Sequence, residues 1–383
     1  MQNRKVNLRT LTEEQLQEYI KANVGIYDEY FDKDFLKELY KHVMDLILRV
    51  YFRPEFIGFD TFPKRNRVDC PLIFASNHSG MAFPWDGIVM AAAFFHIAGY
   101  GENACRPLTS PMLSQTALMN PFLTKNLWKR VGSIDATTLN FETMMQQTDY
   151  NLLIYPEGVP GIGKGFDKKY QLQRFSTSSL RMSLKYKTDI IPVATVNGEY
   201  INPLHYSNAF INKLINKIGI PFLPLGYLTI ILLLQPWLFY FAMPAKLIYV
   251  RGKRIKPYKM LQKPFEEVTR EDLEMLRDKV QSIMQAQLDT AVKEYGQKHY
   301  KLRELVKKAW VNLQYFPYYL PFGWPLLFSD FMRQYKKNGA GKVKMKLGFL
   351  SVFRIFLQNP FLLTYFIPVV GWIPMLIKGY RGK

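Results

Sequence analysis

Cysteine is scarce in this sequence, which has only Cys70 and Cys105 among its 383 residues. Two cysteines do not provide the disulfide framework of a secreted domain, and their spacing matches no metal-binding motif. We therefore expect a reducing compartment and no bound metal. The first residues are polar and lack the apolar core of a signal peptide, so we also expect no cleavable signal.

Negative charge is also in short supply. The chain has 31 Asp and Glu against 51 Lys and Arg, which gives a formal net charge of +20. Such a surplus is typical of proteins that bind nucleic acids or anionic membrane surfaces. No zinc finger, helix-turn-helix or RNP-type motif is visible, so we expect no nucleic-acid partner. Long apolar stretches favour an anionic membrane surface and membrane lipids as partners.

The composition changes along the chain and predicts three parts. Residues 1–52 have the pattern of amphipathic helices, and residues 53–300 alternate strand and helix patterns. Residues 218–245 form an apolar insertion within this second part. Residues 301–383 are rich in aromatic and basic side chains, which predicts a C-terminal membrane-associated region.

Two helices are predicted near the N-terminus. Thr12 and Gln15 form a capping box for the first helix, and Asp32 caps the second. The second helix has an apolar face, which we expect to pack on the main domain rather than contact a membrane. Its members are Leu36, Leu39, Val43, Leu46, Ile47 and Val50.

Residues 75–87 hold the first candidate catalytic residues. A short apolar run before them predicts a buried strand, and the alanine-rich run after them predicts a buried helix. His78 therefore follows a strand, and Asp86 stands near the start of a helix. Neutral imidazole accepts a proton near pH 7, and a carboxylate on its other nitrogen fixes the tautomer. A structural hydrogen-bond network is the alternative for this pair taken alone.

Two further strands end in polar loops. In residues 151–161 an apolar strand ends in a loop that carries Glu157, and in residues 189–198 a strand of the same kind leads to Asn197. Alternating strands and helices predict an α/β fold with a mixed, mostly parallel sheet flanked by helices. Sites in such sheets lie outside the carboxyl ends of the strands, so His78, Glu157 and Asn197 could converge there.

Four sequence blocks in a fixed order resemble the glycerolipid (lysophospholipid, PlsC-like) acyltransferases, over about residues 50–257. The blocks are Asn77-His78 with Asp86, Gly132 with Ile134, Tyr155-Pro156-Glu157-Gly158, and Ile191-Pro192-Val193. The resemblance implies the glycerolipid acyltransferase fold. It also implies that His78, oriented by Asp86, deprotonates an acceptor hydroxyl, which attacks the thioester of acyl-CoA or acyl carrier protein. Glu157 and Gly158 would belong to the acceptor-binding loop. No metal, other cofactor or covalent enzyme intermediate is implied.

The blocks depart from the family pattern at several positions. Seven residues separate His78 from Asp86, where four are usual. Val159 follows Glu-Gly where the family has Thr, Pro160 stands in place of one arginine, and Ala136 lies near the place of another. These arginines would ordinarily bind an acceptor phosphate. Lys164, Lys168 and Arg174 could substitute for them, or could form a solvated basic loop.

Residues 218–245 carry no charge over 28 residues, which is long enough to cross a bilayer. Four prolines interrupt the run, and each removes a helix hydrogen bond. Residues 246–253 resemble the strand that completes the family's sheet, so both ends of the run should lie on one side. We expect a surface-lying or re-entrant element, with a buried helix pair as the alternative.

The C-terminal part predicts membrane contact. Residues 310–328 are aromatic and uncharged, and residues 355–377 form a second uncharged run with three prolines and basic flanks. Trp and Tyr favour the membrane interface, and basic flanks favour the cytoplasmic leaflet. We expect a membrane location at the cytoplasmic face, peripheral or re-entrant. Whether the last run crosses the membrane is left open, although its prolines argue against crossing.

The leading hypothesis for function is a membrane-bound O-acyltransferase acting on a glycerolipid or lysophospholipid hydroxyl. A neutral-lipid acyltransferase using a diacylglycerol-type acceptor is the first alternative, because the two family arginines are missing. A non-catalytic membrane scaffold with the same fold is the second. The presence of His78, Asp86 and Glu157 argues against the scaffold.

Overall fold

The computed structural model describes residues 11–217 and 220–378. At its centre is a seven-stranded sheet with the strand order β1-β7-β6-β2-β5-β3-β4. The strands are β1 (Glu55–Ile57), β2 (Ile73–Ser76), β3 (Cys105–Thr109), β4 (Ile134–Asp135), β5 (Asn151–Ile154), β6 (Ile190–Val196) and β7 (Ile248–Arg251). Every pairing is parallel except that of β6 with β7. The predicted mixed, mostly parallel sheet is confirmed.

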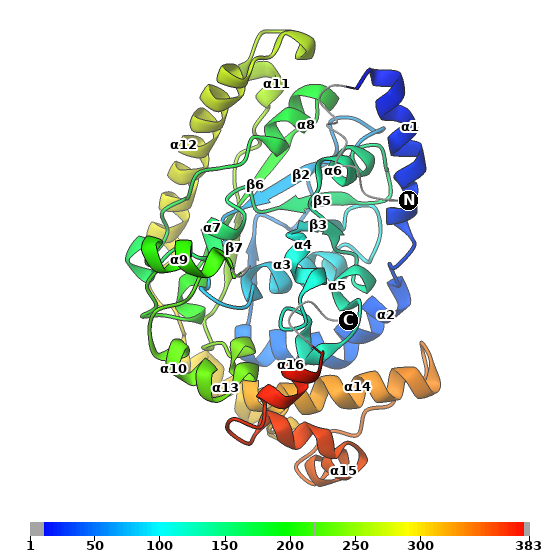
Figure 1. Cartoon of the computed structure of the whole chain (residues 1–383), viewed down its shortest axis with the longest axis vertical. Helices are drawn as coiled ribbons and strands as arrows, with labels where there is room; N and C mark the ends of the chain where they lie inside the picture. Colours follow the sequence, from blue (N-terminus) through cyan, green and yellow to red (C-terminus); the bar gives the residue numbers. More distant parts are fainter. Residues whose placement is uncertain (1–10, 218–219, 379–383) are drawn as a thin grey trace.

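Helices cover the sheet and extend from one end of it (Figure 1). They are α1 (Glu13–Asn23), α2 (Lys33–Leu39), α3 (Trp85–Ile97), α4 (Pro111–Gln115), α5 (Leu127–Arg130), α6 (Thr138–Met144), α7 (Val159–Ile162), α8 (Ser178–Tyr186), α9 (Ala209–Asn216), α10 (Tyr227–Leu234), α11 (Pro257–Met260), α12 (Arg270–Tyr295), α13 (Leu302–Val311), α14 (Trp324–Asn338), α15 (Ser351–Gln358) and α16 (Trp372–Lys378).

Alternating side chains on the central strands build two cores, one on each face of the sheet. On β2, Ile73 and Ala75 join a core with residues of α6, α8 and α12. Phe74 joins the opposite core, which includes residues of α3 and α14. Because successive side chains of a strand point to opposite faces, a strand buried on both faces reads as a continuous apolar run. This burial explains the apolar run that precedes His78.

The N-terminal helices form as their caps predict. Thr12 and Gln15 make the reciprocal bonds of a capping box, and Asp32 accepts a hydrogen bond from the Phe35 amide at 2.8 Å. Helix α2 continues through π-helical turns at Tyr40–Met44 and Ile47–Phe52. All six apolar residues assigned to this face are buried, so the helix packs on the main domain as expected.

The apolar insertion at residues 218–245 is broken into short pieces. Its first two residues lie outside the described part of the chain, and the rest holds α10 and a 3-10 helix at Pro236–Tyr240. Trp237 is buried in the main core, whereas Ile230 and Leu233 are exposed. The insertion thus combines a packed half and an exposed half. Among the described residues, no helix is both long enough and apolar enough to span a bilayer.

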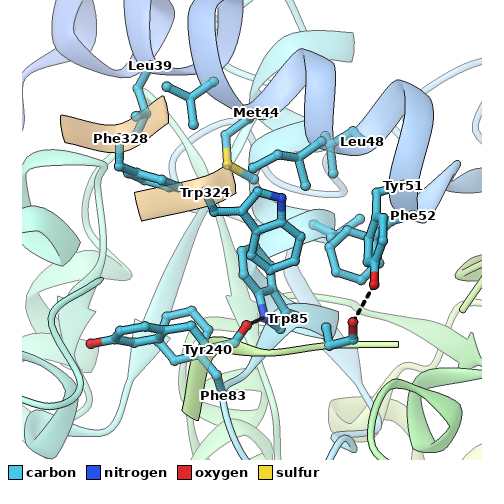
Figure 2. Close-up of a cluster of buried hydrophobic side chains, with 14 of the residues drawn as sticks. Leu39, Met44, Leu48, Tyr51, Phe52, Phe83, Trp85, Tyr240, Trp324 and Phe328 are labelled. Carbon is cyan, nitrogen blue, oxygen red and sulfur yellow. Dashed lines mark hydrogen bonds between the residues drawn. The ribbon is translucent and has the colours of Figure 1, made fainter. Parts of the chain in front are cut away.

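A cluster of buried aromatic side chains joins distant parts of the chain around Trp85 (Figure 2). Trp85 packs against Phe52 and against Trp324, with ring centroids 5.3 and 4.7 Å apart. Its indole N–H donates to the carbonyl oxygen of Tyr240 at 2.9 Å. Because Trp85 precedes Asp86 in the sequence, this cluster fixes the start of α3.

We expect Trp324→Ala to lower the free energy of unfolding by about 3 to 5 kcal/mol, because it leaves a cavity beside Trp85. Denaturant unfolding monitored by circular dichroism measures this loss. Trp310→Ala is the control, since Trp310 is 76% exposed and its removal should change stability by about 0.5 kcal/mol or less. Equal losses in the two variants would contradict the central role of the cluster.

Candidate active site

The loop after β2 is fixed by the side chain of Asn77. Its amide donates to the carbonyl oxygen of Thr195 at 2.9 Å, and its Oδ1 accepts from the Thr195 N–H at 2.7 Å. These two bonds imitate a backbone pair and extend the contact of β2 with β6 by one residue. Asn77 is buried, so both bonds are shielded from water. The next residue, His78, therefore starts from a defined position.

His78 and Asp86 form the pair that the sequence predicts. The Nδ1 atom of His78 lies 2.7 Å from Oδ2 of Asp86. With Nδ1 protonated toward this carboxylate, the lone pair of the neutral ring is on Nε2. Within residues 11–217 and 220–378, Nε2 receives no hydrogen bond. The seven-residue loop between the pair folds back far enough for the two side chains to meet.

Asp86 is held from several sides. Its side chain is fully buried, and its Oδ2 also accepts a hydrogen bond from the Ser79 N–H at 2.9 Å. Oδ1 accepts from the Gly87 N–H at 2.8 Å in the first turn of α3, where the helix dipole favours negative charge. The Tyr249 hydroxyl donates to the Asp86 carbonyl oxygen at 2.7 Å. The carboxylate is thus fixed by His78 and by the N–H groups of Ser79 and Gly87, and the backbone of Asp86 is fixed by Tyr249 of β7.

Glu157 lies beside His78 but binds its backbone. Oε1 of Glu157 accepts from the His78 N–H at 2.9 Å, and Oε2 accepts from the Gln173 N–H at 2.6 Å. Burial raises the pKa of the Glu157 carboxyl, and the nearby Lys164 ammonium and the two N–H donors oppose that rise. Glu157 and His78 therefore converge as predicted. Asn197 does not join them, because its side chain bonds to Lys246, Tyr170 and His299.

A large apolar cavity begins at His78. Its volume is about 520 Å³, which is in the usual range for small-molecule sites. His78, Tyr155 and Gly158 line one part, and Leu36 of α2 and Phe328 of α14 line another. None of the described residues that line the cavity is Asp, Glu, Lys or Arg. The cavity therefore suits a long apolar group that meets an imidazole.

The three basic residues that could bind an acceptor phosphate, Lys164, Lys168 and Arg174, are not part of this lining. Lys164 is buried between two carboxylates, with its Nζ 3.9 Å from Glu157 and 3.4 Å from Glu199. Arg174 is 70% exposed in its side chain and lies 3.8 Å from Glu274. The structure thus places all three away from the cavity, and their predicted substrate contact stays a prediction. Gly158 does line the cavity and has φ of +59°, a conformation that favours glycine.

Tyr155 is a site residue that the sequence did not single out. Its ring packs against the His78 imidazole with centroids 4.3 Å apart, and it lines the cavity. Its hydroxyl is buried without a hydrogen-bond partner in the structure, and burial raises its pKa well above the usual value. In the sequence, an aromatic residue before Pro-Glu-Gly is typical of the end of a buried strand. Nothing in the sequence therefore distinguished Tyr155 from an ordinary core residue.

Comparison with known proteins identifies the domain that carries this site. Residues 54–196 match the family model described as Acyltransferase. This segment is an acyltransferase domain. The match includes His78, Asp86 and Glu157, so the predicted family is confirmed over the residues that form the site. In the part of the chain that the structure describes, no group of three or more His, Cys, Asp or Glu is arranged to hold a metal ion.

Individual relatives of the acyltransferase domain are distant. An uncharacterized protein of Mycobacterium tuberculosis (strain H37Rv) is 24% identical over 200 residues, 52% of each chain. An uncharacterized protein of Mycobacterium leprae is 24% identical over 199 residues, covering 51% of this chain and 50% of that one. The chain thus spans about half the length of the curated relatives it matches. The crystal structure of PlsC, the 1-acyl-sn-glycerophosphate acyltransferase of Thermotoga maritima, is similar with a TM-score of 0.37 and 14% identity, covering 74% of this chain and 96% of that one.

Gly161 in α7 packs directly against the side chains of Glu157 and His78, with no room for a side chain of its own. A Cβ atom at this position would lie 2.7 Å from the Cβ of Glu157 and 3.1 Å from the Cβ of His78. We therefore expect Gly161→Ala to lower the free energy of unfolding by about 1 to 3 kcal/mol through overpacking. Gly25→Ala is the control, because no atom lies within 4 Å of the added Cβ there. A Gly161→Ala protein as stable in thermal unfolding as the control would contradict this close packing.

Proposed function

We propose that this protein transfers a fatty acyl group from an acyl thioester, on CoA or acyl carrier protein, to a lipid hydroxyl. The observation that carries the proposal is the His78–Asp86 pair of the acyltransferase domain, whose imidazole lines a cavity without charged groups among its described residues. A non-catalytic scaffold would not require a carboxylate on Nδ1 and an unbonded Nε2 beside an apolar cavity.

In the proposed step, Nε2 of His78 takes the proton of the acceptor hydroxyl. The hydroxyl oxygen then attacks the thioester carbonyl carbon and forms a tetrahedral intermediate. When the intermediate collapses, the carbon–sulfur bond breaks and an ester remains. The leaving thiolate takes the proton from the imidazolium, which returns His78 to its neutral state. Asp86 stabilises the imidazolium in between and keeps the ring in one tautomer.

The apolar lining of the cavity supports the proposal that a fatty acyl chain is bound there during transfer. Its lining includes His78 together with residues of α2, α3, the region of α4 and α5, and α14. Burial of each methylene from water contributes about 0.8 kcal/mol, so an uncharged cavity of this size can bind a long chain without any polar contact.

A neutral acceptor such as a diacylglycerol is the second candidate function. It is supported by the absence of charged groups among the described residues of the lining, and by the ion pairs that occupy Lys164 and Arg174. A lysophospholipid would need to place its phosphate outside the cavity. Product analysis with both acceptors offered together would decide between the two candidates.

We expect His78→Ala to lower kcat/KM for acyl transfer by about 100- to 10,000-fold, because the reaction loses its base. Asp86→Asn should lower it by up to about 10,000-fold, since the imidazole loses the anion that orients it and stabilises its charged form. Release of thiol from an acyl-CoA donor measures both. Purified, folded His78→Ala protein with full turnover would contradict the assigned base.

We further propose that the protein sits on an anionic bilayer through one surface, called here the apolar face. Its residues belong to α10, α13, α15, α16 and the turn before α15, and these helices lie toward the lower end of the molecule in Figure 1. The exposed apolar residues of this face are Ile230, Leu233, Val306, Trp310, Leu350, Phe353, Leu357, Leu376 and Ile377.

Hydrogen bonds and sequence spacing support the apolar face as one surface. The Trp372 indole N–H donates to the Leu233 carbonyl oxygen at 2.8 Å, which joins α10 to α16. Val306 and Trp310 stand four residues apart on α13, as do Phe353 and Leu357 on α15. Exposed lysines flank these stripes at Lys307, Lys308, Lys342 and Lys344. Apolar burial and attraction to anionic headgroups would therefore act together.

We expect the double variant Leu357→Glu, Leu376→Glu to partition onto anionic phosphatidylglycerol vesicles about 10-fold or more weakly than wild type. Both leucines are exposed in the protein, and burying them in the bilayer would contribute about 3 to 6 kcal/mol to binding. Vesicle flotation measures the partitioning. Val68→Glu is the control. Val68 is 89% exposed, but it precedes β2 in the sequence and does not belong to the apolar face. Complete release of the wild-type protein by high salt alone would contradict the embedding of apolar side chains.

A further inference from the structure

We infer that Glu157 is a positioning residue that holds the backbone of His78, rather than a ligand of the acceptor. This inference rests on the proposed acyl transfer with His78 as the base. It changes the role that the family resemblance implied for Glu157, and it comes from the directions of the hydrogen bonds around the carboxylate.

Both oxygens of the Glu157 carboxylate are occupied inside the protein. Oε1 accepts from the His78 N–H at 2.9 Å, Oε2 accepts from the Gln173 N–H at 2.6 Å, and Nζ of Lys164 lies 3.9 Å from Oε2. The Glu157 side chain is 0% exposed, and Glu157 is absent from the cavity lining. Because the side chain is fully buried and does not line the cavity, an acceptor could reach this carboxylate only if the surrounding residues moved apart.

The other partners of Glu157 anchor it to the body of the protein. Gln173 belongs to an extended segment at residues 170–175, which two side chains of α12 hold in place. Gln285 Oε1 accepts from the Leu172 N–H at 2.9 Å, and Gln281 Oε1 accepts from the Phe175 N–H at 3.0 Å. Glu157 thus links the backbone of the base, through the segment at residues 170–175, to α12, which lies outside the acyltransferase domain. Such a link fixes where the imidazole stands in the cavity.

Lys164 provides the positive charge that the buried Glu157 requires. Its Nζ lies between Glu157 and Glu199 and also donates to the Gln171 carbonyl oxygen at 3.1 Å. An ionised carboxylate that is buried without a nearby cation is strongly destabilised. The charge of Lys164 is therefore used inside the protein, which accounts for its position away from the cavity. Glu199, which does not contact His78, offers a matched control in the same cluster.

The kinetic test compares Glu157→Gln with Glu199→Gln. A glutamine at 157 keeps one acceptor oxygen, so either the His78 N–H or the Gln173 N–H loses its partner. Misplacement of a catalytic group by about 1 Å can cost about 100-fold. We expect kcat of Glu157→Gln to fall by about 10- to 100-fold with KM for both substrates within about 2-fold. Glu199→Gln should keep kcat within about 3-fold of wild type.

A second measurement does not need activity. Hydrogen–deuterium exchange on the peptide that contains His78 should show lost protection in Glu157→Gln and retained protection in Glu199→Gln, because only Glu157 accepts from the His78 N–H. Thermal unfolding shows whether each variant is folded. If Glu157→Gln does not fold, Glu157→Ala is used in its place.

The outcomes separate this inference from the proposed function. An increase in KM for the acceptor with kcat unchanged, or unchanged exchange at His78, would overturn the positioning role and leave His78 as the base. Full turnover by His78→Ala would overturn the proposed function itself. A kcat loss of equal size in Glu157→Gln and Glu199→Gln would also overturn the positioning role, because only one of these residues contacts His78.

Discussion

The hydrogen bond between the His78 imidazole and the Asp86 carboxylate is the constraint on which this structure depends. The seven residues between His78 and Asp86 must form a loop that brings the two side chains together. Both ends of this loop are held by residues that lie far away in the sequence. Asn77 ties the His78 end to β6, whereas Trp85 ties the Asp86 end to the aromatic cluster. Tyr249 of β7 adds a bond to the Asp86 carbonyl oxygen. Because a hydrogen bond weakens steeply with poor geometry, the site requires all of these supports together.

The distribution of charge explains how a chain of net charge +20 contains an uncharged cavity. Asp86, Glu157 and Lys164 each have a partner inside the protein, and none of them lines the cavity. Asp86 is paired with His78, and Lys164 lies between Glu157 and Glu199. An unpaired charge facing an apolar chain would cost several kcal/mol, so the pairing of these groups and the binding of a lipid chain are compatible.

The aromatic cluster around Trp85 joins the candidate active site to the C-terminal helices. Trp324 begins α14, Phe328 on the same helix lines the cavity, and Arg354 of α15 pairs with Asp330 of α14 at 3.2 Å. The helices that carry the proposed membrane surface therefore share a core with the residues that position Asp86.

The sequence by itself determined the caps of α1 and α2, the buried strands and the class of the sheet, and its resemblance to a family implied that His78 meets Asp86. The caps and strands follow from local patterns, because capping and alternating burial are set by neighbouring residues, whereas the His78–Asp86 contact is held by residues far along the chain. Only the tertiary structure decided that Glu157 binds the His78 backbone, that Lys164 turns toward two carboxylates, and that the 218–245 run breaks into a packed and an exposed half. A carboxylate after a strand has the same sequence pattern whether it meets a substrate or a backbone N–H. Which partner it meets depends on chain segments far away in the sequence.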